Sequence, residues 1–304
     1  MPVVDEDRLR ATVVHLSETL HPRSFDHHAQ LQMAGRYIRD AFLATGATVT
    51  LQEFTVDEER YFNVVARFGP ADGALTVVGA HYDSYADVWS ENDAGQTDQR
   101  STHTPGADDN ASGVAGLLEL ARLLGQNPPP RPVLLVAYSL EEPPHFPTED
   151  MGSAHHAQLL ASGSAPVDLM ISLEMIGYFS DVSNSQDFPW VGLRLLYPTV
   201  GNFIAIVSRP ADWRQTRALK SHMQGASPLP VHSINAPPWV PGIDLSDHRS
   251  YWAEGIPALM VTDTAFYRND QYHQPGDVAS RLDYRRMGHV VQGVFAFITR
   301  PVGK

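Results

Sequence analysis

Histidine and carboxylate side chains directly follow several short apolar runs of this sequence. Residues 74–80 are followed by His81 and Asp83, residues 133–139 by Glu141 and Glu142, and residues 169–173 by Glu174. A nearly continuous apolar run of this length is typical of a strand buried on both faces of a sheet. Imidazole nitrogen and carboxylate oxygen are the metal ligands that remain when no cysteine is present. The pattern therefore indicates a metal site built at strand ends.

Two further segments supply groups of the same kind. Asp108 and Asp109 precede the apolar stretch 112–124, and His273 lies in a loop after residues 258–262. Each signal alone has an ordinary explanation. Acidic residues before a helix usually cap it, adjacent glutamates usually lie in a solvated loop, and a single histidine is more often a surface residue. Glu174 is harder to explain in this way, because burying an unpaired carboxylate in an apolar run is costly.

Periodicity places these residues on alternating strands and helices. The pattern predicts strands at 48–54, 61–68, 74–80, 133–139, 169–175, 193–196, 203–207 and 258–262, and helices at 5–20, 27–45, 112–124, 152–162, 211–223, 246–253 and 284–297. The fold class is therefore α/β, with a mixed, mostly parallel central sheet and helices on both faces. The first two strands suggest an antiparallel side. No linker interrupts the chain, so a single domain is expected over 1–304, with ligands bound at the carboxyl ends of its strands.

Composition narrows the possible functions. The chain has 304 residues, of which 43% are hydrophobic, so it can bury a full core. It has no cysteine, which excludes disulfides and thiolate metal sites. With 22 basic and 35 acidic residues the formal charge is −13, and nucleic acid is not expected as a partner. No signal peptide or membrane span is visible, so a cytoplasmic protein is expected, with export through a removed leader left open.

The motifs taken together resemble a known family. They are His81-Tyr82-Asp83-Ser84, Pro105-Gly106-Ala107-Asp108-Asp109-Asn110-Ala111-Ser112-Gly113, Glu141-Glu142, Met151-Gly152-Ser153, Glu174-Met175-Ile176-Gly177, Ser246-Asp247-His248 and His273-Gln274-Pro275-Gly276-Asp277. Their order and approximate spacing are similar to those of the di-zinc aminopeptidases that include the bacterial leucyl aminopeptidases. The similarity spans about residues 27–300. The resemblance implies the zinc-dependent exopeptidase fold and an enzyme that acts on peptides with a free N-terminus.

The resemblance also implies a role for each matching residue. Asp109 would bridge two zinc ions, His81 and Glu174 would complete one site, Glu142 and His273 would complete the other, Glu141 would be the general base, and Asp83 would orient the imidazole of His81. A cis peptide bond is expected between Asp109 and Asn110. The other histidines, His103, His145, His155 and His156, are interpreted as loop and helix-surface residues. The aromatic residues Tyr178, Phe179, Trp239, Phe266 and Tyr267 either line a side-chain pocket or belong to the core.

Two departures from the family pattern leave alternatives open. Glu174 stands where aspartate is usual, and the segments 84–104 and 143–150 are longer than usual and are expected over the active edge. The alternatives are a single-zinc acyltransferase similar to the glutaminyl cyclases, and a non-catalytic binding domain on the same scaffold. The preferred N-terminal residue, the number of zinc ions and the oligomeric state do not follow from the sequence.

Overall fold

One mixed eight-stranded sheet organises the protein. The computed structural model describes residues 2–86, 90–91, 97–98 and 103–301. The strand order in the sheet is β1-β2-β6-β3-β7-β10-β8-β9. The strands are β1 (Thr48–Val56), β2 (Glu59–Phe68), β3 (Leu75–His81), β6 (Val133–Tyr138), β7 (Val167–Glu174), β8 (Ile204–Ser208), β9 (Val231–Asn235) and β10 (Ala258–Thr262). A separate two-stranded ribbon joins β4 (Ser90–Glu91) to β5 (Thr97–Asp98).

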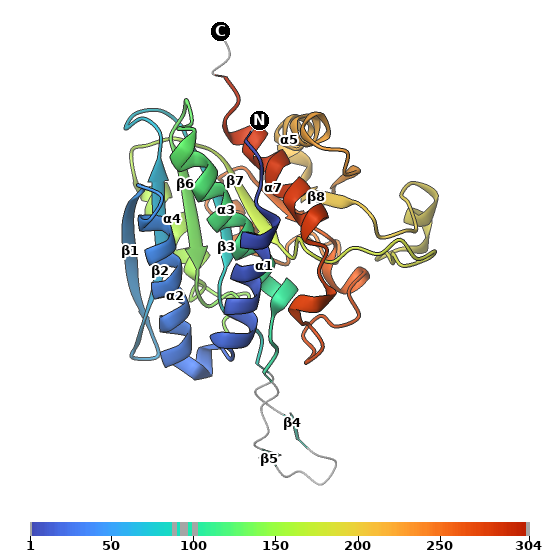
Figure 1. Ribbon diagram of the computed structural model, residues 1–304, viewed down its shortest axis with the longest axis horizontal. Helices are drawn as coiled ribbons and strands as arrows, with labels where there is room; N and C mark the ends of the chain where they lie inside the picture. The colour runs from blue at the N-terminus through green and yellow to red at the C-terminus, as the bar shows by residue number, and fades with distance from the viewer. Residues whose placement is uncertain (1, 87–89, 92–96, 99–102, 302–304) are drawn as a thin grey trace.

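The four central strands β6, β3, β7 and β10 run parallel to one another. On one side β2 is antiparallel to β6 and β1 is antiparallel to β2. On the other side β8 is antiparallel to β10, and β9 is parallel to β8. Because the central strands are parallel, their carboxyl ends share one edge, which lies at the bottom of Figure 1, away from the two chain termini. This edge is where ligands are expected in such sheets.

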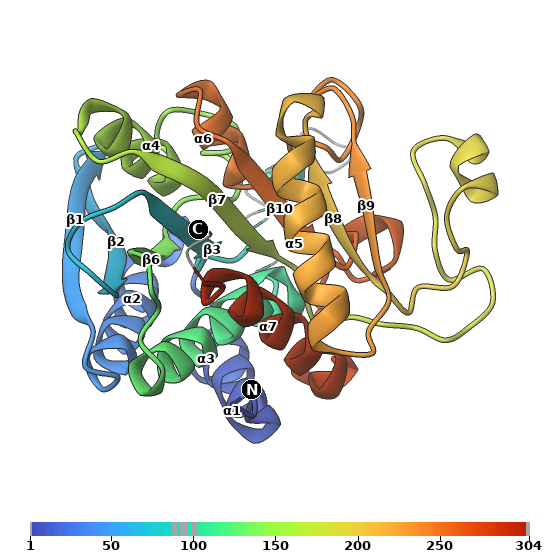
Figure 2. The same cartoon turned by 90° about the horizontal axis from the view of Figure 1, so that it is seen from above.

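Helices cover both faces of the sheet. They are α1 (Glu6–Val14), α2 (His28–Leu43), α3 (Gly113–Gln126), α4 (Gly152–Ser162), α5 (Trp213–Ala226), α6 (His248–Ala253) and α7 (Tyr284–Ile298). Figure 2 shows α4 and α6 on one face and α1, α2, α3 and α7 on the other, and α5 packs through Leu219 and Met223 on the core that α7 covers. The predicted α/β class is confirmed by this arrangement. Among the described residues, no helix is long and apolar enough to cross a membrane.

Strand β6 shows why the sheet is buried on both faces. All six of its residues are buried. Leu135 and Ala137 belong to the larger core under α3 and α7, whereas Leu134, Val136 and Tyr138 belong to the smaller core under α4 and α6. Successive side chains of a strand point to opposite faces, so one apolar run serves both cores. Each fully buried aliphatic side chain of this kind contributes about 1.5 to 3 kcal/mol.

Two predictions at the far side of the sheet were wrong. The segment predicted as a strand at 193–196 belongs to a 3-10 helix at Val191–Leu195, where Val191 is 82% and Leu195 is 89% exposed. An apolar run forms a strand only where a neighbouring strand pairs with it, and this run lies in the excursion between β7 and β8 at the right of Figure 2. Strand β9 was missed, because His232, Ser233 and Asn235 interrupt its apolar pattern.

Candidate metal centre

Two groups of donor atoms meet at the carboxyl edge of the sheet. In the first group, His81 Nε2 lies 3.3 Å from Asp109 Oδ1 and 3.4 Å from Glu174 Oε2. In the second group, His273 Nε2 lies 3.2 Å from Asp109 Oδ2 and 3.1 Å from Glu142 Oε2. Asp109 belongs to both groups and turns one oxygen toward each. The structure therefore brings together all five residues that were predicted as metal ligands.

The spacing of these atoms fits metal coordination better than hydrogen bonding. Two ligands of a tetrahedral zinc ion with bonds of about 2.0 to 2.1 Å lie about 3.3 Å apart, and the four distances are close to that value. Among the described residues, neither His81 Nε2 nor His273 Nε2 makes a hydrogen bond, although both atoms are buried. Buried polar atoms are normally paired, so these nitrogens lack a partner that an ion would provide. The residues present fit zinc.

Asp109 is positioned through its backbone. It lies in the π-helical turn η3 (Ala107–Ser112), where it has non-helical dihedral angles. The Asp277 carboxylate accepts hydrogen bonds from the N–H groups of Asp108 and Asp109, both at 3.0 Å. The side chain of Asn110 donates to the Leu173 carbonyl at 2.8 Å, beside the end of β7. The expected cis peptide bond between Asp109 and Asn110 is present.

The ends of β6 and β7 turn sharply to present their glutamates. Leu140 has φ 61° and Met175 has φ 48°, both in the left-handed region that residues other than glycine seldom adopt. Such conformations cost about 1 kcal/mol or more and concentrate at functional sites. The Ser246 hydroxyl donates to Glu174 Oε2 at 2.7 Å and fixes the longer carboxylate. Glu174 thus reaches the His81 group although aspartate is usual at this position.

His273 is held between two aromatic rings. Tyr85 stacks on one side of the imidazole with ring centroids 3.9 Å apart, and Tyr272 stacks with centroids 3.8 Å apart. The interplanar angles are 12° and 19°, so both rings lie nearly flat on the imidazole. Sequence reasoning missed this pair. Tyr272 adjoins His273 in the sequence, but nothing in the order of residues indicates that Tyr85 would reach the same ring.

Glu141 and Asp83 lie next to the donor groups. Glu141 Oε2 is 3.8 Å from His81 Nε2, farther than any of the donor oxygens. Asp83 Oδ1 is 3.3 Å from His81 Nδ1, and Asp83 Oδ2 accepts a hydrogen bond from the N–H of Glu142 at 3.0 Å. Asp83 can therefore fix the ring of His81 while it also orders the glutamate loop.

The site concentrates negative charge in a buried place. Burial, together with Glu174, Glu142 and Asp247, raises the pKa of Glu141 well above its usual range and outweighs the lowering by His81. Burial and Asp109 likewise raise the pKa of Glu142 to about 7. The carboxylates in turn raise the pKa of His273 to about 10, although burial opposes this. Mutual repulsion among buried carboxylates is relieved by bound cations, which again fits a metal centre.

The remaining histidines were only partly predicted. His156 on α4 is 2% exposed and not on the helix surface, and its Nδ1 lies 2.5 Å from the Tyr251 hydroxyl. His145 is 6% exposed and its ring packs against Phe25 with centroids 5.4 Å apart. His145 lies in a loop as predicted, although its ring is buried, whereas the helix-surface interpretation of His156 was wrong because Tyr251 from a distant segment covers its ring. Of the residues in the long segment 84–104, those at 87–89, 92–96 and 99–102 lie outside the described residues.

An apolar cleft of about 900 Å³, measured out to open solvent, adjoins the first donor group. Its walls come from β8, β9, β10 and the loops around them, and include Phe188, Phe203, Ala205, Val207, Met260 and Phe266. Glu174 and Tyr272 also line it, so the cleft opens onto the donor atoms. Of the aromatic residues considered from the sequence, Phe266 and Tyr267 line the cleft. Phe179 belongs to the main core, Tyr178 packs against it, and Trp239 is 77% exposed.

Solved structures of peptidases and glutaminyl cyclases have the same fold. The LapA aminopeptidase of Legionella pneumophila superposes with a TM-score of 0.74 at 20% identity, covering 98% of this chain and 73% of that one. A glutaminyl cyclase of Bacteroides thetaiotaomicron superposes with a TM-score of 0.73 at 19% identity, covering 99% of both chains. The chain therefore shares its fold with both enzymes.

The sequence assigns the family. Residues 63–298 match Peptidase family M28, and the chain belongs to that family. The chain is 50% identical to the Escherichia coli protein YfbL over 292 residues, which covers 96% of this chain and 87% of YfbL. It is 25% identical to a probable aminopeptidase of Saccharomyces cerevisiae, over 81% of this chain and 60% of the yeast protein. The resemblance to zinc aminopeptidases is confirmed, and the enzyme is a metallopeptidase.

Proposed function

We propose that the protein is an aminopeptidase that uses two zinc ions to hydrolyse the N-terminal residue of peptides. The observation that carries this proposal is the sharing of Asp109 between two complete donor groups. A carboxylate that turns one oxygen toward each of two neighbouring groups is suited to bridge two ions about 3.5 to 4 Å apart. The first group uses His81 and Glu174, and the second uses Glu142 and His273.

Glu141 is proposed as the general base. When bound, zinc would supply Lewis acidity, polarising the scissile carbonyl and lowering the pKa of water in the site. Glu141 lies beside the donor atoms but outside the donor groups. Its carboxylate is therefore free to accept a proton from the attacking water and to pass it to the leaving amine. Burial strengthens both transfers, because at 8% exposure few solvent molecules compete for the proton.

The apolar cleft suggests which N-terminal residue is cleaved. It lies against Glu174 and Tyr272, where the side chain of a residue bound at the metal centre would project. Its aliphatic and aromatic walls favour large apolar side chains, and burying one leucine side chain is worth about 1.5 to 3 kcal/mol. Leucine and phenylalanine substrates are accordingly expected to react faster than alanine substrates.

Two other functions would use the same scaffold. A single-zinc acyltransferase similar to the glutaminyl cyclases would need only one donor group, whereas both groups are assembled here. A non-catalytic binding domain would have no use for Glu141 at the edge of the donor groups. These observations favour the peptidase over both alternatives.

The proposal is tested by assaying aminoacyl chromogenic substrates before and after chelation. Full activity on leucyl substrates, loss of that activity with chelator and recovery with zinc are the expected results. Release of pyroglutamyl products from N-terminal glutamine peptides, without hydrolysis, would instead establish the acyltransferase. Absence of both activities in zinc-loaded protein would leave only the binding domain.

A further inference from the structure

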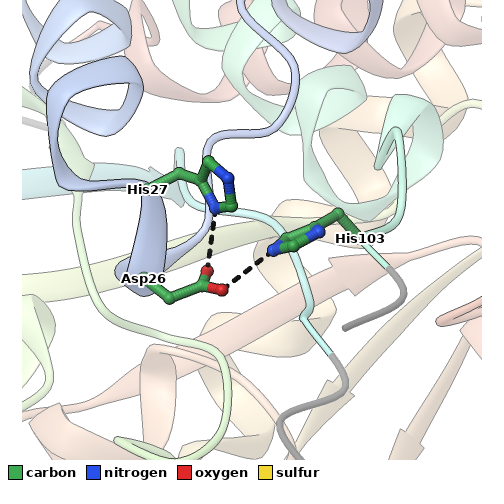
Figure 3. A group of neighbouring side chains, drawn as sticks. All are labelled: Asp26, His27 and His103. Atoms are coloured by element: carbon green, nitrogen blue, oxygen red, sulfur yellow. Dashed lines mark hydrogen bonds and ion pairs between the residues drawn. The ribbon is translucent and has the colours of Figure 1, made fainter. Parts of the chain in front are cut away.

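We propose that Asp26, His27 and His103 form an additional metal site, separate from the catalytic centre and selective for zinc-like ions. Asp26 and His27 belong to the 3-10 turn η2 (Phe25–His27), and His103 lies 76 positions beyond His27 in the sequence. Figure 3 shows the carboxylate of Asp26 between the two imidazole rings. None of the three residues belongs to either of the two catalytic donor groups.

The three donor side chains lie close enough together to hold one ion. Asp26 Oδ1 lies 3.3 Å from His27 Nδ1, and Asp26 Oδ2 lies 2.9 Å from His103 Nε2. The three ligand atoms all lie within 4.8 Å of one another. The first distance equals the separation of about 3.3 Å between two ligands of a tetrahedral zinc ion, whereas the second is a hydrogen bond that a bound ion would replace. A small movement of one ring would open space for an ion.

One of the nitrogens lacks a hydrogen-bond partner. His27 Nδ1 is buried at the atom level, yet it makes no hydrogen bond to any described residue. Its contact with Asp26 has the distance of an ion pair but not the angles of a hydrogen bond. Buried polar atoms normally have a hydrogen-bond partner or bind an ion, and a metal ion would satisfy this nitrogen. The two rings meet nearly at right angles, at 83°, with their centroids 4.3 Å apart.

The donor set is suited to a borderline transition-metal ion. Two imidazoles and one carboxylate suit Zn²⁺, whereas Mg²⁺ and Ca²⁺ prefer oxygen ligands throughout. Burial raises the pKa of Asp26, but Ser24, His103 and His27 outweigh it and hold that pKa below its ordinary value. The carboxylate is therefore ionised at neutral pH. The Ser24 hydroxyl donates to Asp26 Oδ1 at 2.6 Å and orients the carboxylate as supporting residues do in zinc sites.

The cluster is accessible to an ion and to a water ligand. The side chain of His27 is 35% exposed, that of Asp26 is 31% exposed and that of His103 is 13% exposed. Metal sites that need a fourth ligand commonly take it from solvent. Partial exposure also means that the ion can enter and leave the folded protein without unfolding it.

An ion here would connect two segments that lead to the catalytic centre. His103 forms a β-bridge with Ala86, and the N–H of Thr104 donates to the Tyr85 carbonyl at 3.1 Å. The ring of Tyr85 stacks on His273. A metal held by η2 and His103 would therefore fasten the backbone that carries Tyr85 to the N-terminal part of the chain. The expected role is structural, with stability gained from the bound ion.

The decisive experiment compares zinc content in three forms of the full-length protein. Wild-type protein, the double variant His27→Gln/His103→Gln and the control His28→Gln are loaded with Zn²⁺ alone, desalted and analysed for metal. His28 is a suitable control because it adjoins His27, while its Nε2 contacts the Arg60 carbonyl at 2.7 Å instead of the cluster. We expect the double variant to hold one zinc ion fewer per chain than the other two proteins.

Because the result is the difference in zinc content between the proteins, it does not depend on whether the catalytic centre binds one ion or two.

A second measurement is thermal stability. With the catalytic sites filled, added zinc should raise the Tm of wild type and of His28→Gln but not of the double variant. Equal zinc content in all three folded proteins would overturn the proposal and leave a hydrogen-bonded cluster only. If the double variant does not fold, His27→Gln alone serves in the comparison, because that ring is partly exposed. If the zinc-loaded wild-type protein has no peptidase activity, the proposed function is rejected, but the additional metal site is not.

Discussion

Replacing Glu141 by glutamine isolates the proton-transfer step from metal binding. Glutamine has nearly the same shape as glutamate but cannot accept the proton of the attacking water. Glu141 Oε2 lies 3.8 Å from His81 Nε2, whereas the oxygens of the donor groups lie 3.1 to 3.4 Å from the imidazole nitrogens. The substitution should therefore leave the donor groups intact.

The expected loss of catalytic rate in Glu141→Gln follows from the proposed role of this carboxylate as general base. A positioned general base contributes about 10² to 10⁴ in rate, which is about 2.7 to 5.5 kcal/mol of activation free energy. Since Glu141 is not needed to hold the substrate, kcat should fall by that factor while KM changes little.

Three measurements make the prediction specific. Steady-state kinetics on a leucyl substrate give kcat and KM, metal analysis gives the zinc content, and a thermal melt checks folding. The matched control is Glu142→Gln, which alters the neighbouring residue and should reduce zinc content because Glu142 belongs to the His273 group. Wild-type turnover by Glu141→Gln with full zinc would refute the assignment of the base.

Three further predictions concern the cleft and the buried polar residues. Ala205→Phe would fill the apolar cleft. The ratio of kcat/KM for leucyl substrates to kcat/KM for alanyl substrates should then fall about 10-fold or more. An unchanged ratio would show that the substrate side chain binds elsewhere. Arg23→Met removes donors to the carbonyls of Tyr82 and Gly106 inside the protein and should lower unfolding free energy by at least about 3 kcal/mol in urea melts. Burial lowers the pKa of His156 from 6.5 to about 4. The unfolded chain therefore binds a proton first as pH falls, and stability drops by about 2 kcal/mol between pH 8 and pH 5. Melts at both pH values should show a smaller drop in His156→Gln, and an equal drop would contradict this cause.

The ligand set could be anticipated because its signals are local. Each ligand type stands at the end of an apolar run or in a recognisable turn, and parallel central strands bring such ends together. Only the family resemblance indicated that Asp109, and not its neighbour Asp108, would be the shared metal ligand. In the structure Asp108 turns away from the donors and accepts from the N–H of Gly177 and from Asn269.

The features that were not anticipated depend on contacts between distant segments. The buried guanidinium of Arg23 donates to Pro105 and Gly106 carbonyls from more than 80 positions away. Gly106 itself has φ +59°, and a Cβ there would come within 2.2 Å of the Asp109 carbonyl oxygen. The apolar run at 193–196 was wrongly predicted as a strand for a similar reason. Whether such a run forms a strand depends on a neighbouring strand that can pair with it, and not on the run itself.

The two donor groups that share Asp109 are each proposed to hold a zinc ion. Anomalous diffraction at the zinc edge, from crystals of the zinc-loaded protein, would locate these ions. We predict two peaks about 3.5 to 4 Å apart, one among His81, Asp109 and Glu174 and one among Asp109, Glu142 and His273. No zinc peak at this edge of the sheet, or a single peak that leaves one group empty at saturating zinc, would show that the two groups do not each hold an ion.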